Sequence, residues 1–265
     1  MKKLLKRLPV LIIGIPATYY LLVKSELYVL TIFLCIVSLI GQYELFRLLN
    51  KNSEKSHPIF EWLAGLFILI CSYFYNINGL ICSYIISSTI AMLLTVFRGL
   101  KGNGINFFAY KLFNLFYLPF CLACFELISK AKGGQIIFIL LASIWALDIG
   151  AYIFGSIIRG PKLAPNISPN KTISGAIGGA ICSISFIFIM KQYGYFTLDI
   201  TETKFWFLAL SIATIGQIAD LFESVLKREA DVKDSSSLLG AHGGILDRID
   251  SVLFLGPISY IIMLL

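Results

Sequence analysis

The chain has 265 residues, of which 58% are hydrophobic and only 14% are charged, and its formal net charge is +7. A soluble globular domain carries roughly 25% charged residues, so this composition excludes an ordinary water-soluble protein. The mean hydropathy of +0.84 and the repeated long apolar runs indicate a membrane protein instead.

Nine apolar segments approach the length of about 20 residues that a transmembrane helix needs. Runs of this length are typical of helices, whereas the strands of a membrane barrel are shorter and alternate. We therefore expect an all-α, polytopic integral membrane protein with about nine transmembrane helices, which form a single transmembrane domain over residues 1–265. The first segment is expected to stay uncleaved, because no clear small-x-small site follows it. In chain order the segments are Leu8–Val23, Leu27–Phe46, Ile59–Tyr75, Gly79–Phe97, Phe107–Ser129, Gln135–Ile157, Ser174–Met190, Phe205–Ala219 and Ser251–Leu265.

The Lys and Arg residues that flank these segments predict the orientation. With a cytoplasmic N-terminus, sixteen of them fall on the cytoplasmic side and five on the other, which agrees with the positive-inside rule. The net charge then reflects topology and attraction to anionic lipids, and we expect no nucleic-acid partner. The sixteen are Lys2, Lys3, Lys6, Arg7, Arg47, Lys51, Lys55, Arg98, Lys101, Arg159, Lys162, Lys171, Lys227, Arg228, Lys233 and Arg248; the five are Lys24, Lys130, Lys132, Lys191 and Lys204.

The densest polar segment, residues 220–250, follows the eighth apolar run. Asp220, Ser224 and Lys227 are spaced i, i+4 and i+7, so on a continuing helix they share one face. An acid, a hydroxyl and a cation in one stripe can bind a divalent ion and the phosphates that it neutralises. The alternative is a solvated helix end with surface ion pairs, but an acid as close to the hydrocarbon as Asp220 is costly without a partner.

A second polar group precedes the ninth apolar run. Asp247 and Asp250 are spaced i, i+3 and are expected on one face of the first helical turn. Gly243 and Gly244 allow the backbone to approach a ligand closely, and the N–H groups that open this helix could cradle a phosphate. The role of His242 stays open between a hydrogen bond within the loop and a contact with substrate.

Two blocks of the sequence together resemble one enzyme family. The first block reads Ser224-x-Leu226-Lys227-Arg228-x4-Lys233-Asp234, then His242-Gly243-Gly244-x-x-Asp247-Arg248-Ile249-Asp250; the second reads Asp148-x-x-Ala151-Tyr152-x-x-Gly155, then Ser168-Pro169-Asn170-Lys171-Thr172. Both blocks resemble the signature of the phosphatidate cytidylyltransferases, or CDP-diglyceride synthases. The chain departs from that pattern at Ser174, where the family typically has an acid, and at Ala219, where it commonly has glycine. Residues 145–250 form the predicted catalytic region, whereas residues 1–130 match in hydropathy only.

The resemblance implies transfer of CMP from CTP to phosphatidic acid, giving CDP-diacylglycerol and pyrophosphate, with Mg²⁺ as cofactor. It implies that Asp220 and Asp247 are metal ligands and that the catalytic set also includes Ser224, Lys227, Arg228 and Asp250. The implied substrate-binding residues are Asp148, Ser168, Lys171, Thr172, Lys233, Asp234, His242, Gly243, Gly244 and Arg248. The expected partners are CTP, phosphatidic acid and membrane lipids, with a homodimer as the candidate assembly. The expected location is a bacterial-type inner (cell) membrane, with the N-terminus and the active site in the cytoplasm.

Two other functions are weighed against this one. A CTP-dependent lipid kinase acting on a polyprenol or isoprenoid would share the topology but not the complete motif over residues 224–250. A secondary transporter would use Asp148, Lys111 and Asp220 along a pathway through the bilayer. No internal repeat is evident, and the polar groups gather on one side of the membrane, which disfavours transport.

Overall fold

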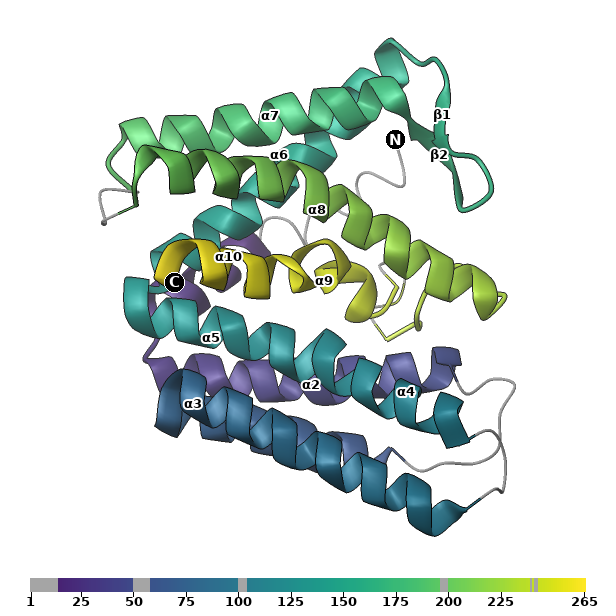
Figure 1. The fold of residues 1–265 in the computed structure, drawn as a ribbon. Helices are drawn as coiled ribbons and strands as arrows, with labels where there is room; N and C mark the ends of the chain where they lie inside the picture. Colours follow the sequence, from purple (N-terminus) through teal and green to yellow (C-terminus); the bar gives the residue numbers. More distant parts are fainter. Residues whose placement is uncertain (1–13, 50–57, 100–103, 196–199, 239, 241–242) are drawn as a thin grey trace.

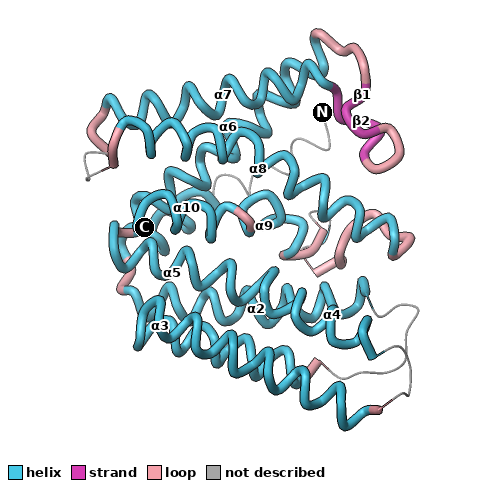
Figure 2. Tube along the Cα trace, in the orientation of Figure 1, coloured by secondary structure: helices cyan, strands magenta, loops and turns pink. Residues whose placement is uncertain are grey.

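The computed structural model describes residues 14–49, 58–99, 104–195, 200–238, 240 and 243–265. It agrees with the predicted all-α class, since the described chain is almost entirely helical apart from one short hairpin (Figures 1 and 2). The π-helical segments are labelled η. The elements are η1 (Tyr20–Lys24), α2 (Leu27–Leu49), α3 (Ile59–Arg98), α4 (Gly104–Leu115), η2 (Phe116–Phe120), α5 (Cys121–Lys132), α6 (Gly134–Ile157), β1 (Lys162–Ala164), β2 (Ser168–Thr172), α7 (Ile173–Gln192), α8 (Glu202–Glu229), α9 (Leu246–Leu253) and α10 (Leu255–Leu264).

Within the described residues, six helical stretches are long and apolar enough to cross a membrane, which supports a polytopic integral membrane protein. The count of nine stays a prediction. The first predicted span, Leu8–Val23, lies largely outside the described residues, and the last is divided between the short helices α9 and α10. The six stretches are Leu27–Leu49, Ile59–Arg98, Gly104–Lys132, Gly134–Ile157, Ile173–Gln192 and Glu202–Glu229.

Helix α3 contains two of the predicted spans, because the chain reverses inside it. Asn76 has φ 55° and ψ −142°, which breaks the helical path. After the break, a Cβ on Gly79 would overlap the carbonyl oxygen of Cys71, so the two arms lie against each other at the turn. The carbonyl of Tyr73 accepts a hydrogen bond of 2.7 Å from Lys130 of α5. The predicted division into Ile59–Tyr75 and Gly79–Phe97 therefore falls at the observed break.

The stretch from α4 through η2 to α5 accommodates a proline within a helix. Pro119 has no backbone N–H and cannot continue the regular ladder of hydrogen bonds. The chain widens locally into the π-helical turn η2 and then resumes as α5. The two short helices α4 and α5 therefore form one continuous stretch long enough to span a bilayer.

The helices run roughly parallel or antiparallel to one another, so their ends gather on two opposite sides (Figure 1). The C-terminal ends of α2, α6 and α8 and the N-terminal ends of α7 and α9 lie on the same side, together with the β1–β2 hairpin. Helices α9 and α10 pack between α8 and α5 and so join the α6–α8 group to the α2–α5 group. The residues of both motif blocks therefore meet at one side of the helical bundle.

Glycines allow α6 and α7 to pack closely. A Cβ on Gly179 would lie 2.7 Å from the carbonyl oxygen of Leu147, and one on Gly150 would lie 2.7 Å from the Sγ of Cys182. Small residues at such contacts let helix backbones approach each other, which is a common means of helix association in membranes. The spacing Gly175-x-x-x-Gly179 predicts this packing, and the structure confirms it.

We predict that Gly179→Val lowers the thermal unfolding midpoint of the detergent-solubilised protein, because the added side chain cannot fit between α6 and α7. Overpacking of this kind costs about 1–3 kcal/mol. The control is Gly104→Ala, where the nearest atom to an added Cβ lies at an ordinary contact distance of 3.5 Å. Equal midpoints for the two variants in a thermal shift measurement would contradict the close packing.

Candidate functional site

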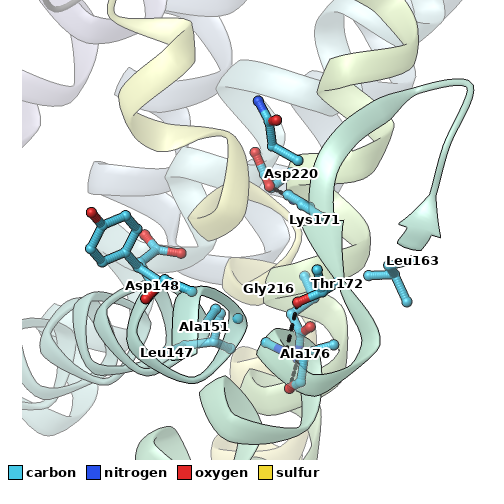
Figure 3. A pocket seen from close by; sticks show the side chains of 15 residues that line it. Leu147, Asp148, Ala151, Leu163, Lys171, Thr172, Ala176, Gly216 and Asp220 are labelled. Carbon is cyan, nitrogen blue, oxygen red and sulfur yellow. Dashed lines mark hydrogen bonds and ion pairs between the residues drawn. The ribbon is translucent and has the colours of Figure 1, made fainter. Parts of the chain in front are cut away.

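A cavity of about 490 Å³ lies between α6, α7, α8 and the β1–β2 hairpin (Figure 3). Its size falls in the range of small-molecule sites, roughly 300–1,000 Å³. Most of its lining is apolar, and its charged side chains are Asp148 of α6, Lys171 of β2 and Asp220 of α8. The full lining is Leu147, Asp148, Ala151, Tyr152, Gly155, Ser156, Leu163, Asn170, Lys171, Thr172, Gly175, Ala176, Gly216, Gln217 and Asp220.

Lys171 and Asp220 form an ion pair on one side of the cavity, and Asp148 projects from α6 on the other (Figure 3). Both paired side chains are about one-third exposed, Lys171 at 31% and Asp220 at 33%, so a ligand can reach them. Burial lowers the pKa of Lys171 below its usual value, while the carboxylates of Asp250 and Asp148 oppose the shift. The lysine therefore lies within the field of several acids at once.

The hairpin that carries Lys171 is held in two places, at the end of β2 and at the turn. At the start of α7, the Thr172 hydroxyl accepts a hydrogen bond of 3.1 Å from the N–H of Gly175 and so caps the helix. At the turn of the hairpin, Arg228 of α8 donates from Nε to the carbonyl of Ile167 at 3.3 Å and from Nη1 to the carbonyl of Val232 at 3.2 Å. Arg228 thus holds the hairpin against the segment that follows α8.

A second charged cluster adjoins the cavity. Lys227 forms ion pairs with Glu223, one turn earlier on α8, and with Asp247 of α9 at 2.7 Å. The other oxygen of Asp247 accepts hydrogen bonds from the backbone N–H and hydroxyl of Ser235, both at 2.9 Å, and from the N–H of Gly244 at 2.8 Å. Burial would raise the pKa of Asp247, but the hydrogen bond from Lys227, those from the N–H groups of Gly244 and Ser235, and the charge of Lys227 outweigh burial and hold the pKa below its usual value. Asp247 is therefore a carboxylate under ordinary conditions.

Asp250 connects this cluster to the cavity. It is 6% exposed, lies beside Glu223 and Lys227, and also acts on Lys171 in the cavity wall. Burial raises the pKa of Asp250, while the N–H of Ser251, which donates at 2.7 Å, and the charge of Lys227 oppose the shift. One acid of α8, Glu223, and one acid of α9, Asp250, thus lie close together, with Lys227 beside them.

One part of the prediction is wrong. The N–H groups that open α9 were expected to cradle a phosphate, but those of Gly244, Ile245 and Leu246 donate to carboxylates of the protein itself. The acceptors are Asp247 for the first and Glu44 of α2 for the other two. Two negative side chains already compensate the positive end of the helix, and these three N–H groups are engaged by the protein itself.

Glu44 is the residue that the motif analysis missed. It is 1% exposed and comes from α2, in the half of the chain that resembled the family in hydropathy only. A lone acid near the end of an apolar span is a signal that could have identified it, because such an acid needs partners. The same rule applies to Glu61, which pairs with Lys111 at 2.6 Å. Lys111 is thus paired with Glu61 rather than with the cavity residues Asp148 and Asp220, which does not support the transporter alternative.

The remaining predicted residues fall around these clusters. Ser168 and Ser224 are half-buried, and the exposed Arg248 lies close enough to Asp148 to act on it electrostatically. Lys233 and Asp234 are exposed in the loop after α8, and His242 lies outside the described residues. Asn170, which lies within the second motif block but was given no role, lines the cavity, and so does Gln217, which lies outside both blocks.

The side chains present are compatible with magnesium bound together with phosphates. Within the described ranges, no group of three His, Cys, Asp or Glu side chains is placed to hold a metal without other ligands. Mg²⁺ is commonly held by one or two carboxylates, with substrate phosphates and waters completing its shell. Asp220 meets this requirement, because its partly exposed carboxylate lies on the cavity wall. The pairing of Asp220 with Asp247 as metal ligands stays a prediction.

The fold and the site together define an integral membrane protein with a charged, phosphate-compatible cavity at one end of its helices. The chain matches the model of the Cytidylyltransferase family over residues 5–265 and belongs to that family. It is 35% identical over 230 residues to the phosphatidate cytidylyltransferase of Staphylococcus haemolyticus (strain JCSC1435), which covers 85% of this chain and 87% of that protein. It is 34% identical over 242 residues to the Bacillus subtilis (strain 168) protein of the same name, covering 88% and 89%. The family match therefore includes the N-terminal helices as well as residues 145–250.

We predict that Arg228→Lys loosens the hairpin, because a single ammonium cannot reach both carbonyls that the guanidinium contacts. Hydrogen–deuterium exchange should increase in peptides covering residues 160–170. Arg159→Lys, which changes an exposed cation of the same loop, should leave the exchange unchanged. Unaltered protection in the Arg228 variant would mean that Arg228 does not hold the hairpin.

Proposed function

We propose that this protein transfers CMP from CTP to phosphatidic acid and so forms CDP-diacylglycerol and pyrophosphate. The observation that carries the proposal is that residues of the motif block Asp148–Thr172 line one cavity at the end of apolar helices, and that Asp250 and Lys227 of the other block lie close enough to act on Lys171 in its wall. Asp148, Lys171 and Asp220 are far apart in the sequence, yet all three line this cavity. The relatives described above are named for this activity, and the match covers most of their length.

The position of the cavity suits a lipid substrate. Tyr152 and Ile157 of α6 are 77% and 74% exposed, and Ile177 of α7 is 58% exposed. Large apolar side chains exposed on spanning helices are suited to contact with lipid tails. The acyl chains of phosphatidic acid can therefore stay in the bilayer while its phosphate enters the cavity from the side, and CTP enters from water.

The charged residues then bring two polyanions together. The phosphate monoester of phosphatidic acid is already ionised near neutral pH, so its oxygen attacks the α-phosphorus of CTP without a strong general base. A new P–O bond forms, the bond from the α-phosphorus to the bridging oxygen breaks, and pyrophosphate leaves with its electrons. Lys171 and Lys227 lie where they can neutralise the phosphates and stabilise the charge that develops. Asp220 and Asp247 pair with these two lysines, and Asp148 and Asp250 act on Lys171 electrostatically.

Mg²⁺ is part of the proposal. Asp220 would hold the ion with the nucleotide phosphates, and Asp247 is the second predicted ligand. Bound there, the ion would supply neutralisation and polarisation of phosphate oxygens. The ion pair of Asp220 with Lys171 keeps both side chains charged and aimed at the same space before substrates arrive.

The alternatives lack comparable support. A lipid kinase would transfer the γ-phosphate of the nucleotide, whereas the relatives that cover most of this chain are named as cytidylyltransferases. A transporter would need polar groups through the bilayer, but Lys111 is paired with Glu61 rather than with the cavity acids. A homodimer remains a proposal that an analysis of mass in detergent can address.

The activity is tested with purified protein in mixed micelles of detergent and phosphatidic acid. CTP labelled at the α-phosphate should give a labelled, solvent-extractable lipid, with one pyrophosphate released per lipid formed. CTP labelled at the γ-phosphate should leave the lipid unlabelled. Chelation of Mg²⁺ should stop the reaction, and its return should restore it. Lipid labelled from the γ-phosphate would identify a kinase instead.

In the same assay, we predict that Asp220→Asn lowers turnover at least about a hundredfold, because loss of a metal ligand removes several kcal/mol of transition-state stabilisation. The apparent Mg²⁺ requirement should also rise. The control is Asp231→Asn, which changes an exposed acid beyond the end of α8 and should keep turnover near that of the wild type. Turnover near wild type in the Asp220 variant, at low Mg²⁺, would refute its role as a ligand.

We also propose that the active site faces the cytoplasm and that nine spans place Leu265 on the opposite side. The charge distribution supports this orientation, and the ends that carry the site lie together in Figure 1. A reporter that is active only in the cytoplasm should be active when fused after Asp231 and silent when fused after Leu265. Activity at both positions would mean that a span has been miscounted.

A further inference from the structure

The Glu44 carboxylate receives an unusual number of hydrogen bonds for a residue on a spanning helix. Its Oε1 accepts from the hydroxyl of Ser236 at 2.6 Å and from the N–H of Ile245 at 3.1 Å. Its Oε2 accepts from the hydroxyl of Ser235 at 3.1 Å and from the N–H of Leu246 at 2.8 Å. The residue is 1% exposed, so these contacts are made away from water. Each oxygen thus accepts one hydrogen bond from a serine hydroxyl and one from a backbone N–H.

These contacts cross almost the whole length of the chain. Glu44 lies on α2, whereas its donors lie in the segment between α8 and α9 and at the start of α9. Two of the four hydrogen bonds come from the start of α9, where the negative charge also compensates the helix dipole, and the other two fix Ser235 and Ser236 in the preceding segment. A Cβ on Gly244 would lie 2.5 Å from both oxygens of Glu44, so the backbone passes close against the carboxylate there.

The hydrogen bonds continue from Glu44 to the reacting site. The backbone N–H of Ser235 also donates to Asp247, and its single hydroxyl proton is shared between the carboxylates of Glu44 and Asp247. Asp247 in turn is paired with Lys227 at 2.7 Å. A displacement of Ser235 or of the first turn of α9 would therefore displace Asp247 and release Lys227 from its position.

We infer that Glu44 is a positioning residue for the transfer reaction. Its buried carboxylate organises the segment from Ser235 to Leu246 and thereby holds Asp247 and Lys227 in the geometry that the reaction needs. The role rests on the proposed function, because it concerns the same site. It assigns to the N-terminal half of the protein a direct part in building that site.

The test compares Glu44→Gln with Glu126→Gln. Glu126 of α5 is also fully buried and accepts hydrogen bonds from two hydroxyls, those of Thr31 and Ser72, but none of its recorded partners belongs to the segment after α8. In the Glu44 variant, whichever way the amide turns, its NH₂ faces one backbone N–H that cannot accept a hydrogen bond. In the Glu126 variant, both hydroxyls can rotate to accommodate the amide.

We expect kcat to fall about tenfold or more in Glu44→Gln, the scale set by losing hydrogen bonds to a charged group, while KM for CTP changes less. Glu126→Gln should keep kcat within about twofold of the wild type, a difference that corresponds to less than one hydrogen bond. Glu44→Asp, which keeps the charge, should retain more activity than Glu44→Ala. If Glu44→Gln and Glu126→Gln share the same kcat, the inference is wrong.

A structural measurement separates this inference from the proposed function. Hydrogen–deuterium exchange without substrates should increase over residues 235–246 in Glu44→Gln but not in Glu126→Gln. Unchanged exchange there would overturn the inference even in an active enzyme. Failure of the wild type to form CMP-lipid would overturn the proposed function, whereas the exchange result would still decide whether Glu44 fixes this segment.

Two nearby serines provide a milder test if the Glu44 variants do not fold. Ser235→Ala removes the hydroxyl that joins Glu44 to Asp247, whereas Ser237→Ala changes an exposed serine two residues away. We expect kcat to fall severalfold in the first variant and to stay near wild type in the second. Equal kcat values in both variants would mean that the path through Ser235 does not position Asp247.

Discussion

The structure depends on one constraint: a charge placed among apolar helices needs a partner of opposite sign or several hydrogen-bond donors. Lys111 and Glu61 satisfy it as an ion pair of 2.6 Å inside the α3–α4 contact. Glu44 satisfies it with four donors from a distant segment. Because each pairing joins different elements, the constraint also fixes how these helices and loops are arranged relative to one another.

The same constraint explains why the site is prepared before substrate arrives. Lys171 and Lys227, the two lysines proposed to meet phosphates, are each held by a carboxylate, Asp220 and Asp247 respectively. Such pairs keep the cations charged in surroundings that disfavour charge. Incoming phosphates can then take the place of these carboxylates beside the lysines. This exchange costs less reorganisation than ordering free side chains.

The N-terminal helices take part in this arrangement. The family match extends over residues 5–265, although the motifs that first indicated the family lie within residues 145–250. Helix α2 supplies Glu44 to the segment that precedes α9, and α9 with α10 packs between α8 and α5. The N-terminal half therefore packs against and hydrogen-bonds to the proposed catalytic region rather than forming a separate unit.

The sequence by itself determined the helical membrane class, most of the span positions and the residues of the motif blocks, because hydropathy and i, i+4 spacing act locally along the chain. It placed Asp220 and Lys227 correctly on one continuing helix. Only the tertiary structure decided that Lys171 pairs with Asp220, that the N–H groups opening α9 are used by Glu44 and Asp247, and that Asn76 reverses α3. These features join residues up to about two hundred positions apart or depend on the conformation of one residue, and neither leaves a periodic signal in the sequence.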